Sequence, residues 1–168
     1  MRVLEEQPCG LITAFDRVIF AAWSAVPSND AMAARMLDAS HREAERQGKV
    51  ALLVALSHGA PMPSDTVRNT IQVEMRKLDP FLICGATVID KAGFRASALR
   101  AVVSTMQLIS RPKHPEKVFA SAAEAVHFIR AELQLAGVEP PLSTDLLLSY
   151  QSIVEKAQTL GTASTTSM

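Results

Sequence analysis

The stretch Lys49–Ser57, KVALLVALS, decides the fold class of this chain. Its seven central residues, 50–56, are all apolar, and no polar position alternates with them. A strand that is apolar on both sides is typical of a parallel sheet covered by helices on both faces. The run Phe81–Asp90, FLICGATVID, repeats the pattern. We therefore expect an α/β domain with at least these two buried strands.

Helical periodicity precedes and follows the first buried strand. Residues 31–47 are rich in good helix formers and are followed by Gly48, a natural helix stop. Asp79-Pro80 ends the helix between the two strands, because the residue before a proline disfavours helical backbone. The apolar residues of that helix recur at helical spacing and are Val67, Ile71, Met75 and Leu78.

The remaining segments extend the alternation of strands and helices. Two β-rich runs within residues 10–26 meet at Asp16-Arg17, which predicts a hairpin or one bent strand pair. Residues 94–109 carry the apolar face of a long helix, and a short strand at 117–120 leads to a helix with a Ser-x-x-Glu capping box. The order β-β-α-β-α-β-α-β-α predicts a mixed, largely parallel sheet of four to five strands with packing helices.

The chain divides into one domain and its appendages. We expect an N-terminal segment at 1–9, the α/β domain at 10–137, a linker with a C-terminal amphipathic helix at 138–161, and a disordered tail at 162–168. The Pro-Pro pair at 140–141 separates the last helix from the domain. That helix either packs on its own sheet or docks on a partner.

Composition narrows the classes of partner. The 168 residues are 48% hydrophobic, and 17 basic residues balance 17 acidic ones. A neutral chain lacks the basic field of a nucleic-acid binder, so we expect no nucleic-acid partner. No apolar run approaches the ~18 residues that span a bilayer, and the N-terminus lacks the pattern of a signal peptide. We therefore expect a cytoplasmic protein with no membrane insertion.

Three segments resemble the STAS-domain superfamily, in its SpoIIAA-like (STAS/SEC14-like) group. EKVFASAAEAVHFIRAEL at 116–133 resembles the strand, capped turn and helix that end those domains. KVALLVAL at 49–56 resembles their central strand, and VIDKAGFRASALRAVV at 88–103 resembles the next strand with its turn and helix. The resemblance covers residues 10 to 136 and consists mostly of apolar patterns that define the fold. It implies a STAS-like sheet and a regulatory role.

The resemblance also points to a serine. STAS regulators of the anti-sigma-factor-antagonist type carry an Asp-Ser pair at the start of the helix after the central strand, and that serine is their phosphorylation switch. Here the corresponding loop, LSHGAPMPSDT at 56–66, is longer, and Ser64-Asp65 has the reverse order. We keep Ser64 and Ser57 as candidate switch or phosphorylation residues.

The same loop contains two serines, a histidine and an aspartate, which are the ingredients of a hydrolase triad, and Ser57 and His58 are neighbours in it. Neighbouring residues on an extended chain point to opposite faces, and Gly59 alone does not make a Gly-x-Ser-x-Gly turn. The alternative is that Ser64 caps the next helix, with Asp65 at its positive end. We therefore expect no catalytic residue and no cofactor. We also expect no metal site, because the four histidines lack the spacing of metal ligands.

A candidate anion site follows the second buried strand. Gly93 lies in the turn, Arg95 in the first helical turn and Arg100 further along. Backbone amides at a helix N-terminus, together with arginine, hold phosphate or carboxylate groups. Ligands in open α/β sheets bind at this edge, although arginines on a helix are usually solvated.

Candidate interface residues lie at both ends of the chain. Trp23 on an early strand is either core or part of an exposed docking patch. The C-terminal helix adds the stripe Leu146, Leu147, Tyr150, Ile153 and Val154.

Two functions from different classes follow. The first is a non-catalytic regulatory or scaffolding module that binds a protein partner or forms a homodimer. The second is a sensor domain that binds a small nucleotide, anion or lipid at the strand-end edge. The second predicts a cavity beside the strand ends, lined by Met and Leu side chains from the helices.

Overall fold

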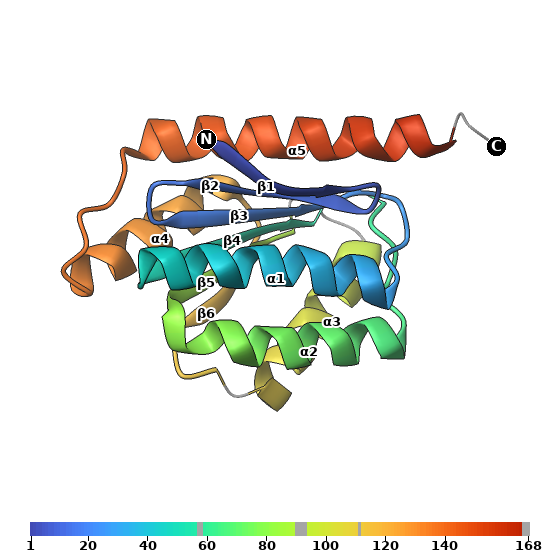
Figure 1. Cartoon of the computed structure of the whole chain (residues 1–168), viewed down its shortest axis with the longest axis horizontal. Helices are drawn as coiled ribbons and strands as arrows, with labels where there is room; N and C mark the ends of the chain where they lie inside the picture. Colours follow the sequence, from blue (N-terminus) through green and yellow to red (C-terminus); the bar gives the residue numbers. More distant parts are fainter. Residues whose placement is uncertain (57–58, 90–93, 111, 166–168) are drawn as a thin grey trace.

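The structure, a computed structural model, describes the backbone of residues 1–56, 59–89, 94–110 and 112–165. It describes their side chains except at 94–96, 106–110 and 163–165. An α/β fold results, in which a six-stranded mixed sheet has helices on both faces (Figure 1). The expected α/β class is therefore confirmed.

The strands lie in the sheet in the order in which they occur in the chain. The first three are joined by antiparallel pairing, and those from the third to the sixth by parallel pairing. The strands are β1 (Arg2–Gln7), β2 (Gly10–Phe15), β3 (Val18–Trp23), β4 (Val50–Leu56), β5 (Leu82–Val88) and β6 (Glu116–Phe119).

Two expectations about the sheet need correction. The sheet has six strands rather than four to five, and parallel pairing is confined to β3–β6. The additional strand is β1, which falls in the segment 1–9 that we had placed outside the domain. Its sequence RVLEEQ has no apolar run, because an edge strand is held by backbone pairing and its side chains are largely in water.

The helices separate onto the two faces of the sheet. Right-handed connections between neighbouring parallel strands place α1, α2 and α3 together on one face. The other face carries α4 and α5 (Figure 1). The bounds are α1 (Asp30–Gln47), α2 (Asp65–Leu78), the short 3-10 helix η1 (Asp79–Phe81), α3 (Phe94–Ser110), α4 (Ala122–Leu135) and α5 (Ser143–Thr165).

Two hydrophobic cores follow from the strand alternation. On β3 and β4, Ile19 and Leu52 contribute to the core under α1, while Phe20 and Leu53 contribute to the core under α4 and α5. Gly10 on β2 is required by close packing, because a Cβ there would lie 2.3 Å from the carbonyl oxygen of Ala22. The apolar runs of the central strands are thus buried from both sides.

The C-terminal helix packs on the sheet of its own chain. Leu146 and Ile153 are each 1% exposed in the core under α4 and α5. Arg130 on α4 fixes the preceding linker by donating hydrogen bonds to the Pro141 carbonyl (2.8 Å) and the Ser143 hydroxyl (2.7 Å). The helix continues to Thr165, past residue 161, where we expected it to end.

Candidate functional site

A cavity lies between the sheet and the three helices of one face. Its volume is about 200 Å³, and we call it the α1–α3 cavity. Its walls come from β3, β4, β5 and β6, from helices α1, α2 and α3, and from the loops that follow β3 and β4. The position beside the carboxyl ends of parallel strands is the usual ligand position in open α/β sheets.

The cavity lies beside the middle of the apolar stripe of α2. Val67 and Leu78 at the two ends are 2% and 1% exposed, whereas Ile71 and Met75 between them are only half-buried and line the cavity. The wall opposite them contains the small residues Ala21 and Gly85. The middle of the stripe is therefore less buried than its two ends.

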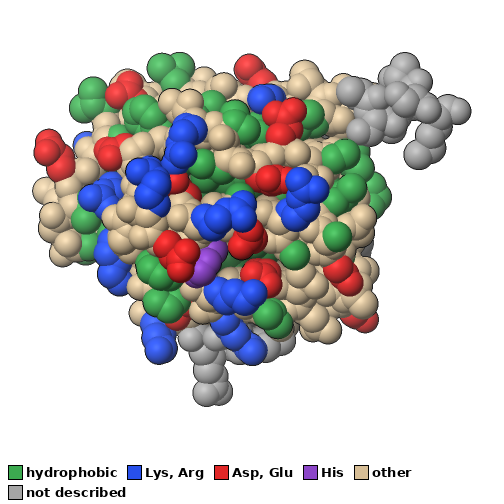
Figure 2. Space-filling view, viewed as in Figure 1, with side chains coloured by type: hydrophobic (Ala, Val, Ile, Leu, Met, Phe, Trp, Pro, Cys, Tyr) green, Lys and Arg blue, Asp and Glu red, His purple; other side chains and the backbone are tan. Residues whose placement is uncertain are grey.

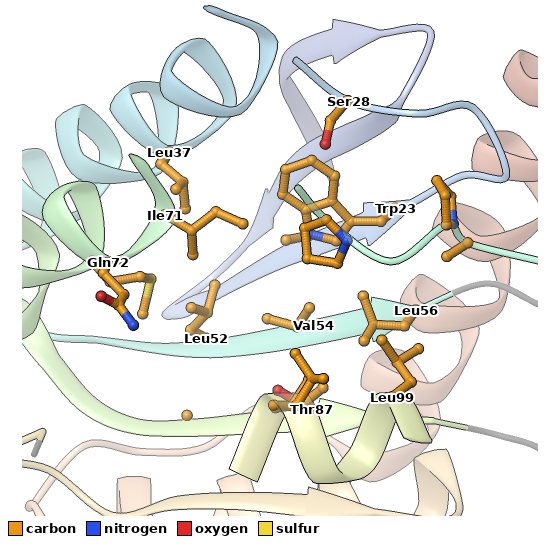
Figure 3. A pocket seen from close by; sticks show the side chains of 18 of the residues that line it. Trp23, Ser28, Leu37, Leu52, Val54, Leu56, Ile71, Gln72, Thr87 and Leu99 are labelled. Carbon is orange, nitrogen blue, oxygen red and sulfur yellow. The ribbon is translucent and has the colours of Figure 1, made fainter. Parts of the chain in front are cut away.

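Apolar side chains make most of the wall. Figure 3 shows Leu52, Val54 and Leu56 along β4, facing Ile71 of α2 and Leu99 of α3. The Trp23 ring lies at the end where β3 leads into the next loop. An apolar wall of this kind favours a ligand with a hydrocarbon or aromatic body.

A few polar groups interrupt the apolar wall. The Ser24 hydroxyl is satisfied, because it donates to the Pro8 carbonyl at 2.8 Å. By contrast, the side chains of Ser28, Gln72 and Thr87 form no hydrogen bond with any residue that the structure describes. Thr87 is only 9% exposed, and its side chain lies at the cavity (Figure 3). A hydroxyl and an amide on a cavity wall can hydrogen-bond to a molecule in the cavity.

Among the described residues that line the cavity, Glu116 is the one that carries a charge. Its Oε1 is hydrogen-bonded to Nε2 of His114 at 3.0 Å. Nδ1 of the same imidazole lies 2.8 Å from Oδ1 of Asp79, a close approach of ionisable groups without hydrogen-bond geometry. The His114 side chain is 4% exposed, so this contact is shielded from solvent. The backbone amide of Lys113 also donates to Asp79 at 3.1 Å. The hydrogen bond with His114 therefore fixes the position of the Glu116 carboxylate.

The structure distributes the sequence-derived candidates over different places. Trp23 lines the cavity. Ser64 is exposed and caps α2, since its hydroxyl accepts a hydrogen bond from the Val67 amide at 3.3 Å, which confirms the predicted cap. Ser57 and His58 lie outside the described residues, so the hydrolase alternative has no described geometry.

The candidate anion site is described only in part. Gly93 and the side chain of Arg95 lie outside the described residues. Arg100 on α3 donates a hydrogen bond to the carbonyl oxygen of Ile89 at 2.7 Å. One described role of this arginine is therefore to join α3 to the end of β5.

The stripe of α5 is divided between burial and partial exposure. Leu146, Tyr150 and Ile153 belong to the core of their own chain, and Leu147 and Val154 pack against it from partly buried positions. The face that we considered for a partner is thus the face that covers β2 and β3.

Charges outside the cavity are mixed or paired. Figure 2 shows Lys and Arg side chains interspersed with Asp and Glu over the face formed by α1 and α2.

Glu43 on α1 is 4% exposed and accepts hydrogen bonds from Arg46 at 2.6 and 3.0 Å. Hydrogen bonds from Arg46 and, more weakly, from Gln47 and Arg2 lower the pKa of Glu43 to about 2, against the opposing effect of burial. This cluster ties β1 to α1.

Sequence reasoning missed the polar residues of the cavity. His114 lies between Pro112 and Pro115 in the sequence, and nothing there places it beside Asp79. Gln72 and Thr87 belong to no motif that marks a binding site. The one available signal was a polar residue, Thr87, within the apolar run of a buried strand.

The chain was compared with family models, with curated proteins and with solved structures, and none of these comparisons gave a match. Among the described helices, none combines the length and the apolar character that crossing a bilayer requires. In the described part of the chain, no three His, Cys, Asp or Glu side chains gather in a way that could hold a metal ion.

Proposed function

We propose that this chain is a binding domain for a small, mainly apolar molecule, which occupies the α1–α3 cavity. The observation that carries the proposal is the cavity of about 200 Å³ between the strand ends and three helices. Its lining includes Met75, Leu37 and Leu99 from those helices, which is the kind of lining that the small-ligand hypothesis requires.

The size of the cavity sets the size of the ligand. An engineered apolar cavity of about 150 Å³ binds benzene, so a somewhat larger one suits a molecule of about ten non-hydrogen atoms. At roughly 0.5 to 0.8 kcal/mol per atom, such a ligand binds with a dissociation constant between the micromolar and sub-millimolar ranges. That affinity fits a sensor that exchanges its ligand readily.

The burial of the lining favours occupancy. Ile71, Met75 and Val54 line the cavity and are only half-buried. An apolar ligand removes their remaining exposed surface from water, which contributes about 25 cal/mol for each Å² covered. The alternative function, a regulatory or scaffolding module that binds a protein partner or itself, stays a prediction, and the packing of α5 on its own sheet gives it no added support.

The proposal is tested with 1-octanol as the probe and Trp23 as the reporter. Trp23 is the single tryptophan of the chain and lines the cavity, so its emission reports on occupancy without a label. We expect a saturable change in Trp23 emission during titration with 1-octanol. Emission and thermal stability that both remain unchanged up to the solubility limit of the alcohol would contradict the proposal.

A further inference from the structure

The end of the cavity between Leu52 and Glu116 has a different chemistry from the rest. Leu52, Gly85 and Glu116 lie in one row across β4, β5 and β6, because the parallel register pairs Gly85 with both of the others. All three line the cavity. A Cβ on Gly85 would lie 3.0 Å from Cγ of Glu116. The absence of a side chain at Gly85 therefore gives the Glu116 side chain room to lie over β5.

The charge at this end is negative. Asp79 and Glu116 approach the two nitrogens of His114 at 2.8 and 3.0 Å. Two carboxylates around one imidazole leave a net negative charge whether or not the imidazole is protonated. The side chains of Glu116 and Asp79 are only 14% and 19% exposed, so water screens this charge weakly.

Other polar groups of the same cavity wall form no hydrogen bond with the described residues. Thr87 follows Gly85 by two positions on β5 and therefore points to the same face. Its hydroxyl and the Gln72 amide line the cavity without a described hydrogen-bond partner. Hydroxyl and amide oxygens accept hydrogen bonds, as the Glu116 carboxylate does. An ammonium group donates three hydrogen bonds and accepts none, which matches such a set of acceptors.

We propose that the ligand of the α1–α3 cavity is an apolar amine, whose ammonium group lies beside Glu116 and whose hydrocarbon body extends toward Trp23. This inference rests on the proposed function, since it assigns the class of molecule that the cavity takes. Glu116 supplies the charge, and His114 positions its carboxylate. The apolar wall between the two ends excludes water from the ion pair and strengthens it.

The test compares three probes of equal chain length: octylamine, 1-octanol and octanoate. Each is titrated against the full chain, with Trp23 emission as the readout. We expect octylamine to bind at least about tenfold more tightly than octanoate, because a hydrogen bond to a charged group is worth roughly 1.5–3 kcal/mol. In Glu116→Gln the affinity for octylamine should fall about tenfold, and the affinity for 1-octanol should fall less.

The matched control is Glu155→Gln, which makes the same chemical change at an exposed position of α5. It should bind all three probes as the wild type does, and circular dichroism checks that both variants are folded. If octylamine and 1-octanol bind equally well and Glu116→Gln affects both alike, the amine assignment is overturned while the cavity remains a ligand site. If no probe binds, the proposed function fails as well.

Discussion

Trp23 on β3 lies opposite Leu56 on β4 in the parallel register, and both side chains line the α1–α3 cavity. This pair stands at the carboxyl ends of the strands, where the sheet meets the loops that follow. The parallel pairing of β3 with β4 buries the centre of the sheet and also brings these two side chains to the cavity wall. The fold itself therefore forms part of the proposed binding site.

A ligand that fills the cavity should stabilise the folded chain. At a concentration of 100 times the dissociation constant, a ligand that binds only the folded state adds about 2.7 kcal/mol to the free energy of unfolding. For a chain of this size, that corresponds to a rise in Tm of about 5–10 °C. We expect octylamine to produce such a rise in a thermal melt, and octanoate at the same concentration to produce a smaller one. Equal shifts for both probes would speak against the amine assignment.

Glu43 should make the stability depend on pH in the acidic range. Its pKa is about 2 in the folded chain, below the ordinary glutamate pKa of 4.5. A carboxylate with a lowered folded pKa stabilises above its unfolded pKa, and this contribution disappears as the pH falls from about 4.5 to about 2. We expect Glu43→Gln to lower the free energy of unfolding at pH 7 by up to about 3 kcal/mol.

The measurement for Glu43 is urea unfolding at several pH values between 2 and 7. The difference between wild type and Glu43→Gln should shrink steadily below pH 4.5. Exposed Glu155→Gln serves as the matched control and should leave the stability at pH 7 nearly unchanged. A difference between wild type and Glu43→Gln that stays constant over the whole range would show that this ion cluster does not contribute as described.

Thr13 on β2 is a candidate for a stabilising substitution. Its side chain is fully buried, and its hydroxyl has no hydrogen-bond partner among the described residues. Thr13→Val removes the unpaired polar group and keeps a β-branched side chain, which suits a strand. We expect the free energy of unfolding to rise by about 1 kcal/mol, as measured by urea unfolding at pH 7. A loss of 1 kcal/mol or more would mean that the hydroxyl is satisfied in solution.

The two cysteines should be unreactive in the folded protein. Cys9 and Cys84 are both fully buried. Burial raises the pKa of the Cys9 thiol to about 11, and burial together with the charge of Glu132 raises that of Cys84 to about 12. The thiolate is the reactive form, so we expect no labelling by a maleimide at pH 7.5 until urea unfolds the chain. Rapid labelling of either thiol in native buffer would indicate that its burial is incomplete.

The central strands and the helices that follow them could be predicted from sequence because each leaves a local signature. The apolar runs of β4 and β5, the Ser64 cap and the Asp79-Pro80 stop all act within a few residues. The edge strand β1 could not be predicted, since its pairing with β2 depends on backbone hydrogen bonds that its polar sequence does not reveal. The STAS-like resemblance and its implied serine switch remain predictions.

The site was harder to predict than the fold. The spacing of Val67, Ile71, Met75 and Leu78 is the same whether a helix packs tightly or lines a cavity, so the sequence could not show that the middle of α2 forms part of a cavity wall. The contact of His114 with Asp79 joins residues 35 positions apart in the sequence, and no local pattern encodes it. The sequence offered Trp23 as core or as part of a docking patch, and the structure places it in a cavity wall.

The most direct test of the account is the affinity of 1-octanol for the pair Val54→Phe and Val73→Phe, measured by Trp23 emission. Val54 on β4 lines the cavity. Val73 on α2 is 51% exposed and does not line the cavity, so Val73→Phe is the control with the same chemical change. A phenyl ring at residue 54 occupies the space of the ligand. We predict that Val54→Phe weakens binding at least about tenfold and that Val73→Phe binds as the wild type does. Binding of undiminished affinity in Val54→Phe would contradict the claim that the α1–α3 cavity is the ligand site.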